Sequence, residues 1–317
     1  MTVQGVLPVG AAVRVRAPAS SANLGPGFDS IGLALGVWDE LDFTVTAQPG
    51  LVIDVAGSGA EGVPRDESHL VYRSFVRALR EIGVAVPAGL RMETRNAVPH
   101  GRGMGSSATA IVAGVVAAYG IVGRDPQSAP GDDIAIDLAA VNRLASELEG
   151  HPDNASATVY GGMTLSWNDD VTGETVTIGL PLHPSVTAVV FVPETTLATH
   201  TARALLPERV PLRDAALNSA RAGLLVEAAT RRPELLVAAT RDWLHQEARR
   251  PSYAASMALV DHLRASGHAA TISGAGPSVL ALTTLERSSS VAAPDGDATW
   301  RRLEPGIPRD GVVVTAR

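Results

Sequence analysis

The chain has 317 residues, of which 45% are hydrophobic and 19% charged, and its formal net charge is −7. An acidic balance of this size argues against a nucleic acid or an anionic membrane surface as a binding partner. The absence of cysteine excludes disulfide bonds, thiolate zinc sites, iron–sulfur clusters and a cysteine nucleophile. All 26 basic residues are arginine, which also excludes a Walker A lysine, a protein-kinase strand lysine and Schiff-base chemistry.

The first residues do not have the pattern of a secretory signal peptide. Residues 1–12 lack the basic region and the continuous apolar run of a signal peptide. No uninterrupted apolar run approaches the roughly 20 residues that a membrane-spanning helix needs. We therefore expect a cytoplasmic protein without a membrane partner.

The first third of the chain alternates short strands with turns. Strand-like patterns occupy residues 12–19, 37–47, 51–57 and 90–95. Between the third and fourth of these, apolar residues at helical spacing predict a helix that begins after Ser68 as N-cap and ends at Gly83.

The middle of the chain is richer in helix. The small and apolar stretch at residues 106–120 predicts a buried helix, and residues 134–150 predict a second one. Residues 158–167 have a strand-like pattern. The polar stretch "NDDVTG" that follows fits either a hairpin or a domain boundary.

The C-terminal part mixes strands with helices. Strands are expected at residues 185–193, 269–274 and 278–283, with helical stretches between residues 213 and 266. Because the strands and helices do not alternate regularly, the pattern predicts an α+β fold rather than a doubly wound sheet. We place the boundary between an N-terminal domain, 1–168, and a C-terminal domain, 169–317.

The segment "PHGRGMGSSATA", residues 99–110, joins a predicted strand to a predicted helix. Glycines at 101, 103 and 105 allow positive φ and close approach of the backbone to a ligand. Ser106 and Ser107 then open a helix whose first N–H groups and dipole favour an anion. Because the chain has no lysine, the candidate hydrogen-bond donors to a phosphate group are the backbone amides, the serine hydroxyls and Arg102. The alternative is an ordinary glycine-rich turn with a serine cap.

Two further segments contain more special residues than a turn requires. "PASSANLGPGFDSIGLAL", residues 18–35, crowds Asn23 and Asp29 together with glycines after a strand. "ISGAGPSVLAL", residues 272–282, is a second glycine-rich turn between apolar runs. Each could be a simple connection when taken alone, because these residue types are common turn formers.

Together the three segments resemble the signature motifs of the GHMP kinase superfamily, and they are most similar to its homoserine kinase branch. "PHGRGMGSSA" is similar to the phosphate loop written P-x-x-x-G-L-G-S-S-A, with Met104 in place of leucine, and "ELEGHPDN" resembles a neighbouring element. The similarity spans Val13 to about Leu282. It implies a ribosomal protein S5 domain 2-like N-terminal domain, a ferredoxin-like C-terminal domain, and ATP-dependent phosphorylation of the L-homoserine hydroxyl.

The resemblance implies which residues bind ATP and Mg²⁺. The triphosphate is expected within the loop formed by Pro99, His100, Gly101, Arg102, Gly103, Met104, Gly105, Ser106, Ser107, Ala108 and Thr109. Mg²⁺ is expected on a serine, with Ser107 chosen, and on one carboxylate. Glu147 is the predicted carboxylate, because Glu149 lies two residues away on a helix and should face another side.

The substrate site implied by the resemblance separates two charges. Asp29 would face the ammonium, and Arg203 and Arg249 would bind the carboxylate, since a guanidinium offers a planar two-pronged donor face. The remaining predicted substrate contacts are Asn23, His151, Thr199 and Gly274. Arg250 stays open as a replacement for Arg249, because Ala248 stands where the family usually has an aromatic residue.

The predicted catalytic set is Asn154, Glu147, Ser107 and Arg203. Asn154 stands where other branches of the superfamily have an aspartate that resembles a base, and a neutral amide cannot accept a proton. The resemblance therefore implies catalysis by positioning and charge stabilisation, without a dedicated base. Asp153 remains a weaker candidate for a base.

Three other functions remain open at this point. The chain could phosphorylate another small hydroxy amino acid or alcohol, or it could be a catalytically silent sensor that binds ATP. An RNA-binding role, suggested by the ribosomal-protein-like domain, is opposed by the acidic balance. A homodimer is left open as the assembly.

Overall fold

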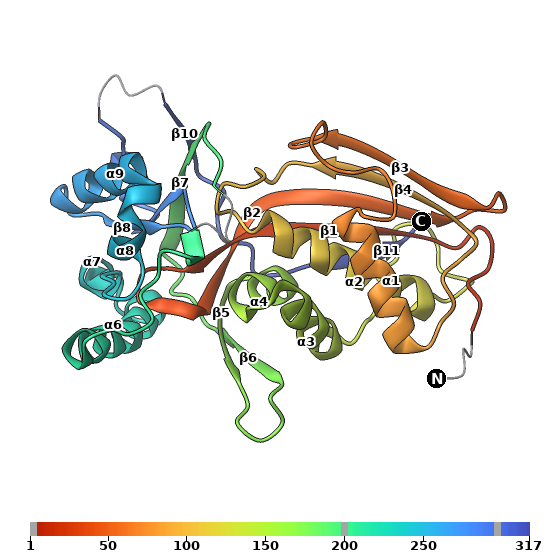
Figure 1. Cartoon of the computed structure of the whole chain (residues 1–317), viewed down its shortest axis with the longest axis horizontal. Helices are drawn as coiled ribbons and strands as arrows, with labels where there is room; N and C mark the ends of the chain where they lie inside the picture. Colours follow the sequence, from red (N-terminus) through yellow and green to blue (C-terminus); the bar gives the residue numbers. More distant parts are fainter. Residues whose placement is uncertain (1–4, 198–201, 295–298) are drawn as a thin grey trace.

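The computed structural model describes residues 5–197, 202–294 and 299–317. Two sheets organise these residues, and helices pack on each (Figure 1). The larger sheet has seven strands in the order β11-β1-β2-β4-β3, with β5 paired to β2 and β6 paired to β5. The smaller sheet has four strands in the order β10-β7-β9-β8. This arrangement confirms the predicted α+β fold with two domains.

The strand bounds are β1 (Ala12–Asn23), β2 (Gly27–Val45), β3 (Gly50–Gly57), β4 (Gly89–Asn96), β5 (Met163–Asn168), β6 (Thr175–Leu180), β7 (Val186–Pro193), β8 (Ala269–Ile272), β9 (Val279–Thr284), β10 (Trp300–Leu303) and β11 (Val313–Ala316). The helices are α1 (Leu70–Ile82), α2 (Ser106–Gly123), α3 (Leu138–Glu149), α4 (Pro152–Tyr160), α6 (Leu212–Thr230), α7 (Leu236–Ala239), α8 (Gln246–Arg249) and α9 (Ala254–Ala265). Helices α1 to α4 belong to the larger sheet, and α6 to α9 gather beside the smaller one (Figure 1).

Helix α1 shows how the N-terminal core forms. Its buried residues include Val71, Phe75 and Leu79, which recur at helical spacing. The Phe75 ring stacks on Phe43 of β2 with 5.3 Å between ring centroids. The predicted N-cap was wrong by one residue: the side chain of His69 accepts from the N–H of Val71, because Ser68 is held by Asp66 in the preceding turn.

Helix α2 lies at the centre of the same core. It has 18 residues with a mean hydropathy of 1.7, enough by length and composition to cross a membrane, but 67% of it is buried inside the protein. Gly114 allows α1 to approach closely, because a Cβ there would lie 2.3 Å from the Val71 carbonyl oxygen. Its apolar character therefore reflects burial on several sides.

The segment after α3 differs from the prediction. Residues 158–160 belong to α4, which starts at Pro152 and ends before Gly161 with φ 77°, and the strand begins only at Met163. Pro152 fits the first turn of a helix, where its missing N–H costs nothing. The β-branched and aromatic residues that suggested a strand are instead packed in helical geometry.

The polar stretch after β5 is the turn of a hairpin. Strands β5 and β6 pair from Met163 with Leu180 to Asn168 with Thr175. The boundary expected between residues 168 and 169 therefore falls inside one sheet, and a division by sheets falls between Leu180 and Val186. The larger sheet also includes β11, near the C-terminus, which pairs antiparallel with β1.

Candidate active site

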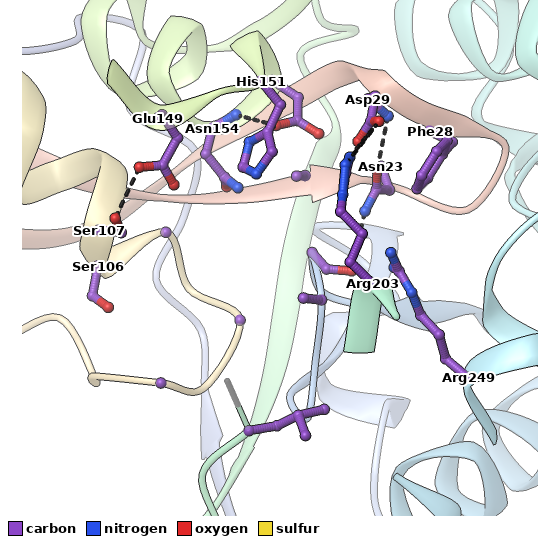
Figure 2. A pocket seen from close by; sticks show the side chains of 18 residues that line it. Asn23, Phe28, Asp29, Ser106, Ser107, Glu149, His151, Asn154, Arg203 and Arg249 are labelled. Atoms are coloured by element: carbon purple, nitrogen blue, oxygen red, sulfur yellow. Dashed lines mark hydrogen bonds and ion pairs between the residues drawn. The ribbon is translucent and has the colours of Figure 1, made fainter. Parts of the chain in front are cut away.

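A pocket lies where the turns of the two sheets meet (Figure 2). It is lined by the β1–β2 turn, the glycine loop, the start of α2, the α3–α4 junction, two arginines and the β8–β9 turn. Segments from residue 22 to residue 275 thus converge on one place. All three sequence motifs contribute to it.

The glycine loop depends on its three glycines. Gly101, Gly103 and Gly105 have φ of 64°, 71° and 69°, which residues with a side chain rarely adopt. A Cβ on Gly103 would lie 2.3 Å from the Ser273 carbonyl oxygen, so the loop packs directly against the β8–β9 turn. Gly105 is the N-cap of α2 and provides no side-chain cap. The first N–H groups of α2 are therefore left for an anion.

Other residues of the predicted loop support it from behind. Arg102 does not line the pocket: its guanidinium donates to the carbonyl oxygens of His100, Pro193 and Glu194 at 2.7–3.0 Å. Pro99 and His100 likewise lie outside the pocket lining, and Met104, Ala108 and Thr109 are buried. These carbonyl groups use three of the Arg102 donors, and its contact with phosphate stays a prediction.

The carboxylate nearest the glycine loop is Glu149, not Glu147. Glu149 lines the pocket and accepts from the Ser107 hydroxyl at 2.8 Å (Figure 2). Glu147 is 56% exposed and pairs with Arg77 at 3.2 Å. The structure brings Glu149 to the pocket in place of the predicted Glu147, because Glu149 ends α3, where the left-handed Gly150 turns the chain toward α4. Burial raises the pKa of Glu149, while the Ser107 hydrogen bond acts in the opposite direction.

The start of α4 adds three polar side chains to the pocket. His151 lies with Nδ1 3.5 Å from Oδ1 of Asp153, close enough for an ion pair but not aligned as a hydrogen bond. That carboxylate raises the pKa of His151. Asn154 accepts from the Ser20 hydroxyl at 3.1 Å through Oδ1, so its NH₂ end is left to contact a ligand.

Asn23, which ends β1, and Asp29, near the start of β2, have strained backbone conformations on either side of the β1–β2 turn. Asn23, Leu24 and Asp29 have φ of 70°, 46° and 54°. Positive φ outside glycine is uncommon and clusters at functional sites. Asn23 stabilises the turn by accepting from the Asp29 N–H at 2.9 Å and donating to the Gly274 carbonyl oxygen at 3.1 Å.

Two arginines reach the pocket from the C-terminal domain. Arg203 pairs with Asp29 at 2.5 Å. Arg249 is only 3% exposed, its Nε donates to the Ala202 carbonyl oxygen at 3.1 Å, and burial lowers its pKa. Arg250 faces away and pairs with acidic side chains of α8 and α9 at 2.7 and 2.9 Å. Of the two candidates, Arg249 therefore lies in the pocket. Thr199 lies outside the described residues.

Two aromatic residues that the sequence analysis missed lie beside these arginines. Phe28 lines the pocket, and the buried ring of His245 stacks on it with 5.1 Å between ring centroids. Phe28 directly precedes Asp29, and His245 lies one helical turn before Arg249. Their positions next to predicted ligands are the only signal that the sequence offered.

The pocket offers oxygen ligands suited to Mg²⁺. Within residues 5–197, 202–294 and 299–317 there is no cluster of three or more histidine, aspartate or glutamate side chains that could hold a metal alone. Mg²⁺ at phosphate-transfer sites takes one or two protein ligands, and the rest are phosphate oxygens and water. The adjacent oxygens of Glu149 and Ser107, beside an anion-binding helix start, fit that requirement.

Comparison with known proteins identifies the family of this chain. Residues 69–162 match the GHMP kinases N terminal domain, and residues 222–294 match the GHMP kinases C terminal domain. A homoserine kinase of Streptomyces coelicolor is 49% identical over 96% of this chain and 94% of its own length. One of Rhodococcus erythropolis is 48% identical over 98% of both chains. The solved structure of a homoserine kinase from Cytophaga hutchinsonii has a TM-score of 0.81 and 25% identity, covering 97% of this chain and 98% of that one. The chain therefore belongs to the GHMP kinase family, within its group of homoserine kinases.

Proposed function

We propose that this protein transfers the γ-phosphoryl group of ATP to the side-chain hydroxyl of L-homoserine, which gives O-phospho-L-homoserine and ADP. The observation that carries the proposal is one pocket with two ends. The glycine loop and the start of α2 form an anion-binding end, and Asp29, Arg203 and Arg249 form an end with both charges. The curated relatives at about half identity are named homoserine kinases.

The phosphate end binds ATP through backbone groups. The pocket is lined at the positive end of the α2 dipole, which favours phosphate oxygens, by Gly101, Gly103, Gly105, Ser106 and Ser107. Glu149 and Ser107 would hold Mg²⁺, which neutralises charge on the phosphates when it is bound. Glu149 must be ionised for this role; burial raises its pKa, and the hydrogen bond from Ser107 opposes that shift.

The substrate end recognises a zwitterion. The ion pair between Asp29 and Arg203 occupies the place where opposite charges of a ligand would bind. The ammonium group of homoserine then contacts Asp29, and its carboxylate contacts Arg203 and Arg249. Asn23 and His151 also line the pocket and contact the remaining polar atoms. Thr199 remains a predicted contact.

Phosphoryl transfer needs the hydroxyl oxygen in line with the γ-phosphorus. The new O–P bond forms as the bond to the β-phosphate oxygen breaks, and the hydroxyl proton passes to a phosphate oxygen. Asn154 supports this route, since its amide can orient the hydroxyl but cannot accept the proton. Asp153 is 2% exposed and lies against His151, so it orients that ring rather than acting as the base.

An ADP-release assay tests the proposal across L-homoserine, L-serine, L-threonine, mevalonate and galactose. We expect the highest kcat/KM with L-homoserine. Activity with another alcohol and none with homoserine would show that the other alcohol is the substrate. ATP binding without any ADP release would indicate a silent sensor. Cytoplasmic location, a homodimer, and the lack of nucleic-acid and membrane partners stay predictions.

A further inference from the structure

Phe28 lies next to both arginines of the substrate end. The Cζ atoms of Arg203 and Arg249 lie 5.7 and 5.6 Å from its ring centroid, within the range of a cation–π interaction. The His245 ring stacks on it at an interplanar angle of 29°. Figure 2 shows Phe28 next to Asp29, with both guanidinium groups reaching into the same pocket. One half-buried ring thus contacts both cations of the substrate end.

The turn that precedes Phe28 is held by the C-terminal domain. The Gly25 carbonyl oxygen accepts from Nε2 of His245 at 2.8 Å, and the Pro26 carbonyl oxygen accepts from Asn218 at 2.9 Å. A Cβ on Gly25 would lie 2.4 Å from the Thr240 carbonyl oxygen. The turn is therefore inserted tightly between these groups, and the Phe28 ring has a fixed support.

His245 connects this support to Arg249. Since Nε2 donates to the Gly25 carbonyl oxygen, Nδ1 carries a lone pair toward Nη1 of Arg249 at 3.4 Å. Burial lowers the pKa of His245, which keeps the ring neutral beside the cation. Asp242 lies 3.6 Å from Nε2 and uses its carboxylate to cap the turn before α8. Arg249 is thus held by Phe28, His245 and the Ala202 carbonyl oxygen, without a carboxylate partner among the described ion pairs.

We propose that Phe28 is a positioning residue that sets the preference of this site for alcohols bearing a carboxylate. The inference rests on the proposed function. An arginine side chain has many rotamers, and a ring that attracts the guanidinium limits them before substrate arrives. Arg203 and Arg249 come from different segments, and both contact Phe28. Loss of the ring should therefore weaken carboxylate binding and leave the phosphate end unchanged.

The test compares L-homoserine with 3-aminopropan-1-ol, which has the same hydroxyl and ammonium groups but no carboxylate. Phe28→Leu keeps an apolar side chain and removes the aromatic face. We expect kcat/KM for L-homoserine to fall about tenfold, equivalent to about 1.4 kcal/mol, with little change for 3-aminopropan-1-ol or in KM for ATP. Phe28→Tyr keeps the ring and should restore the preference.

Phe43→Leu is the matched control, because this ring stacks on Phe75 in the N-terminal core, away from the pocket. It should lower the melting temperature without changing the ratio between the two substrates. Phe28→Met replaces Phe28→Leu if the latter does not fold. A wild-type preference that persists in Phe28→Leu or Phe28→Met overturns the inference alone. A wild-type enzyme without activity on L-homoserine overturns the proposed function first.

Discussion

Replacing Glu149 by glutamine separates the charge of this side chain from its shape. The amide oxygen of the new side chain could still accept the Ser107 hydroxyl hydrogen bond, which is 2.8 Å long to the carboxylate, so the fold should persist. What is lost is one negative charge beside the phosphate end. Removing one preorganised group that stabilises the transition state costs about 2.7–4 kcal/mol, or about 10²–10³ in kcat. We expect a loss of this size, together with a higher Mg²⁺ concentration for half-maximal activity.

Glu147→Gln is the control on the same helix. Its pair with Arg77 is exposed, and Arg77 keeps a second contact to Glu81 at 2.6 Å. An exposed pair contributes about 0–1 kcal/mol to stability, so kcat and the Mg²⁺ dependence should stay near wild type. Both variants would be measured by ADP release at saturating substrates with varied Mg²⁺. A large loss in Glu147→Gln, or none in Glu149→Gln, would refute the assignment.

The pH profile gives a second readout for Glu149. Burial raises the pKa of its carboxyl group, so the group takes up a proton at higher pH than an exposed glutamate. The protonated form cannot bind a cation, and kcat/KM for ATP should therefore fall as pH drops through this raised pKa. Glu149→Gln should lack this acid limb.

Two further predictions concern the substrate end and the base of the glycine loop. Arg203→Ala should raise KM for homoserine sharply and leave KM for ATP nearly unchanged. Arg250→Ala, which alters only surface pairs, should change neither KM value. An equal rise of both KM values in Arg203→Ala would indicate a folding defect. Asp39 accepts from the N–H groups of Ala97 and Val98, and burial raises its pKa from 3.8 to about 6. The folded state thus binds this proton more tightly than the unfolded chain, so the associated stability is present at low pH and is lost as pH rises through about 6, by up to about 3 kcal/mol. Asp39→Asn should show a flatter dependence of unfolding free energy between about pH 4 and 7, and an unchanged slope would contradict this assignment.

Local chemistry made much of the phosphate end predictable from the sequence. Alternating glycines before Ser106 and Ser107 require a flexible loop at a helix start whichever tertiary contacts form. The apolar pattern of α2 likewise predicts its burial. These features depend on residues close together in the chain.

The errors lie where distant contacts decide the outcome. Glu147 and Glu149 were separated by helical spacing alone, but Arg77 from α1 and the turn at Gly150 determine which one faces the pocket. Residues Thr158 and Val159 favour strands intrinsically, yet the packing of α4 overrides that preference. Phe28 contacts two arginines from the far half of the chain, and no local pattern predicts such contacts.

The most direct measurement is a crystal structure with a non-hydrolysable ATP analogue and Mg²⁺. We predict phosphate oxygens within hydrogen-bonding distance of the amides between Gly101 and Ser107, with the metal ion on Glu149 and Ser107. Phosphates bound away from the start of α2, or a metal ion held by Glu147, would contradict this account.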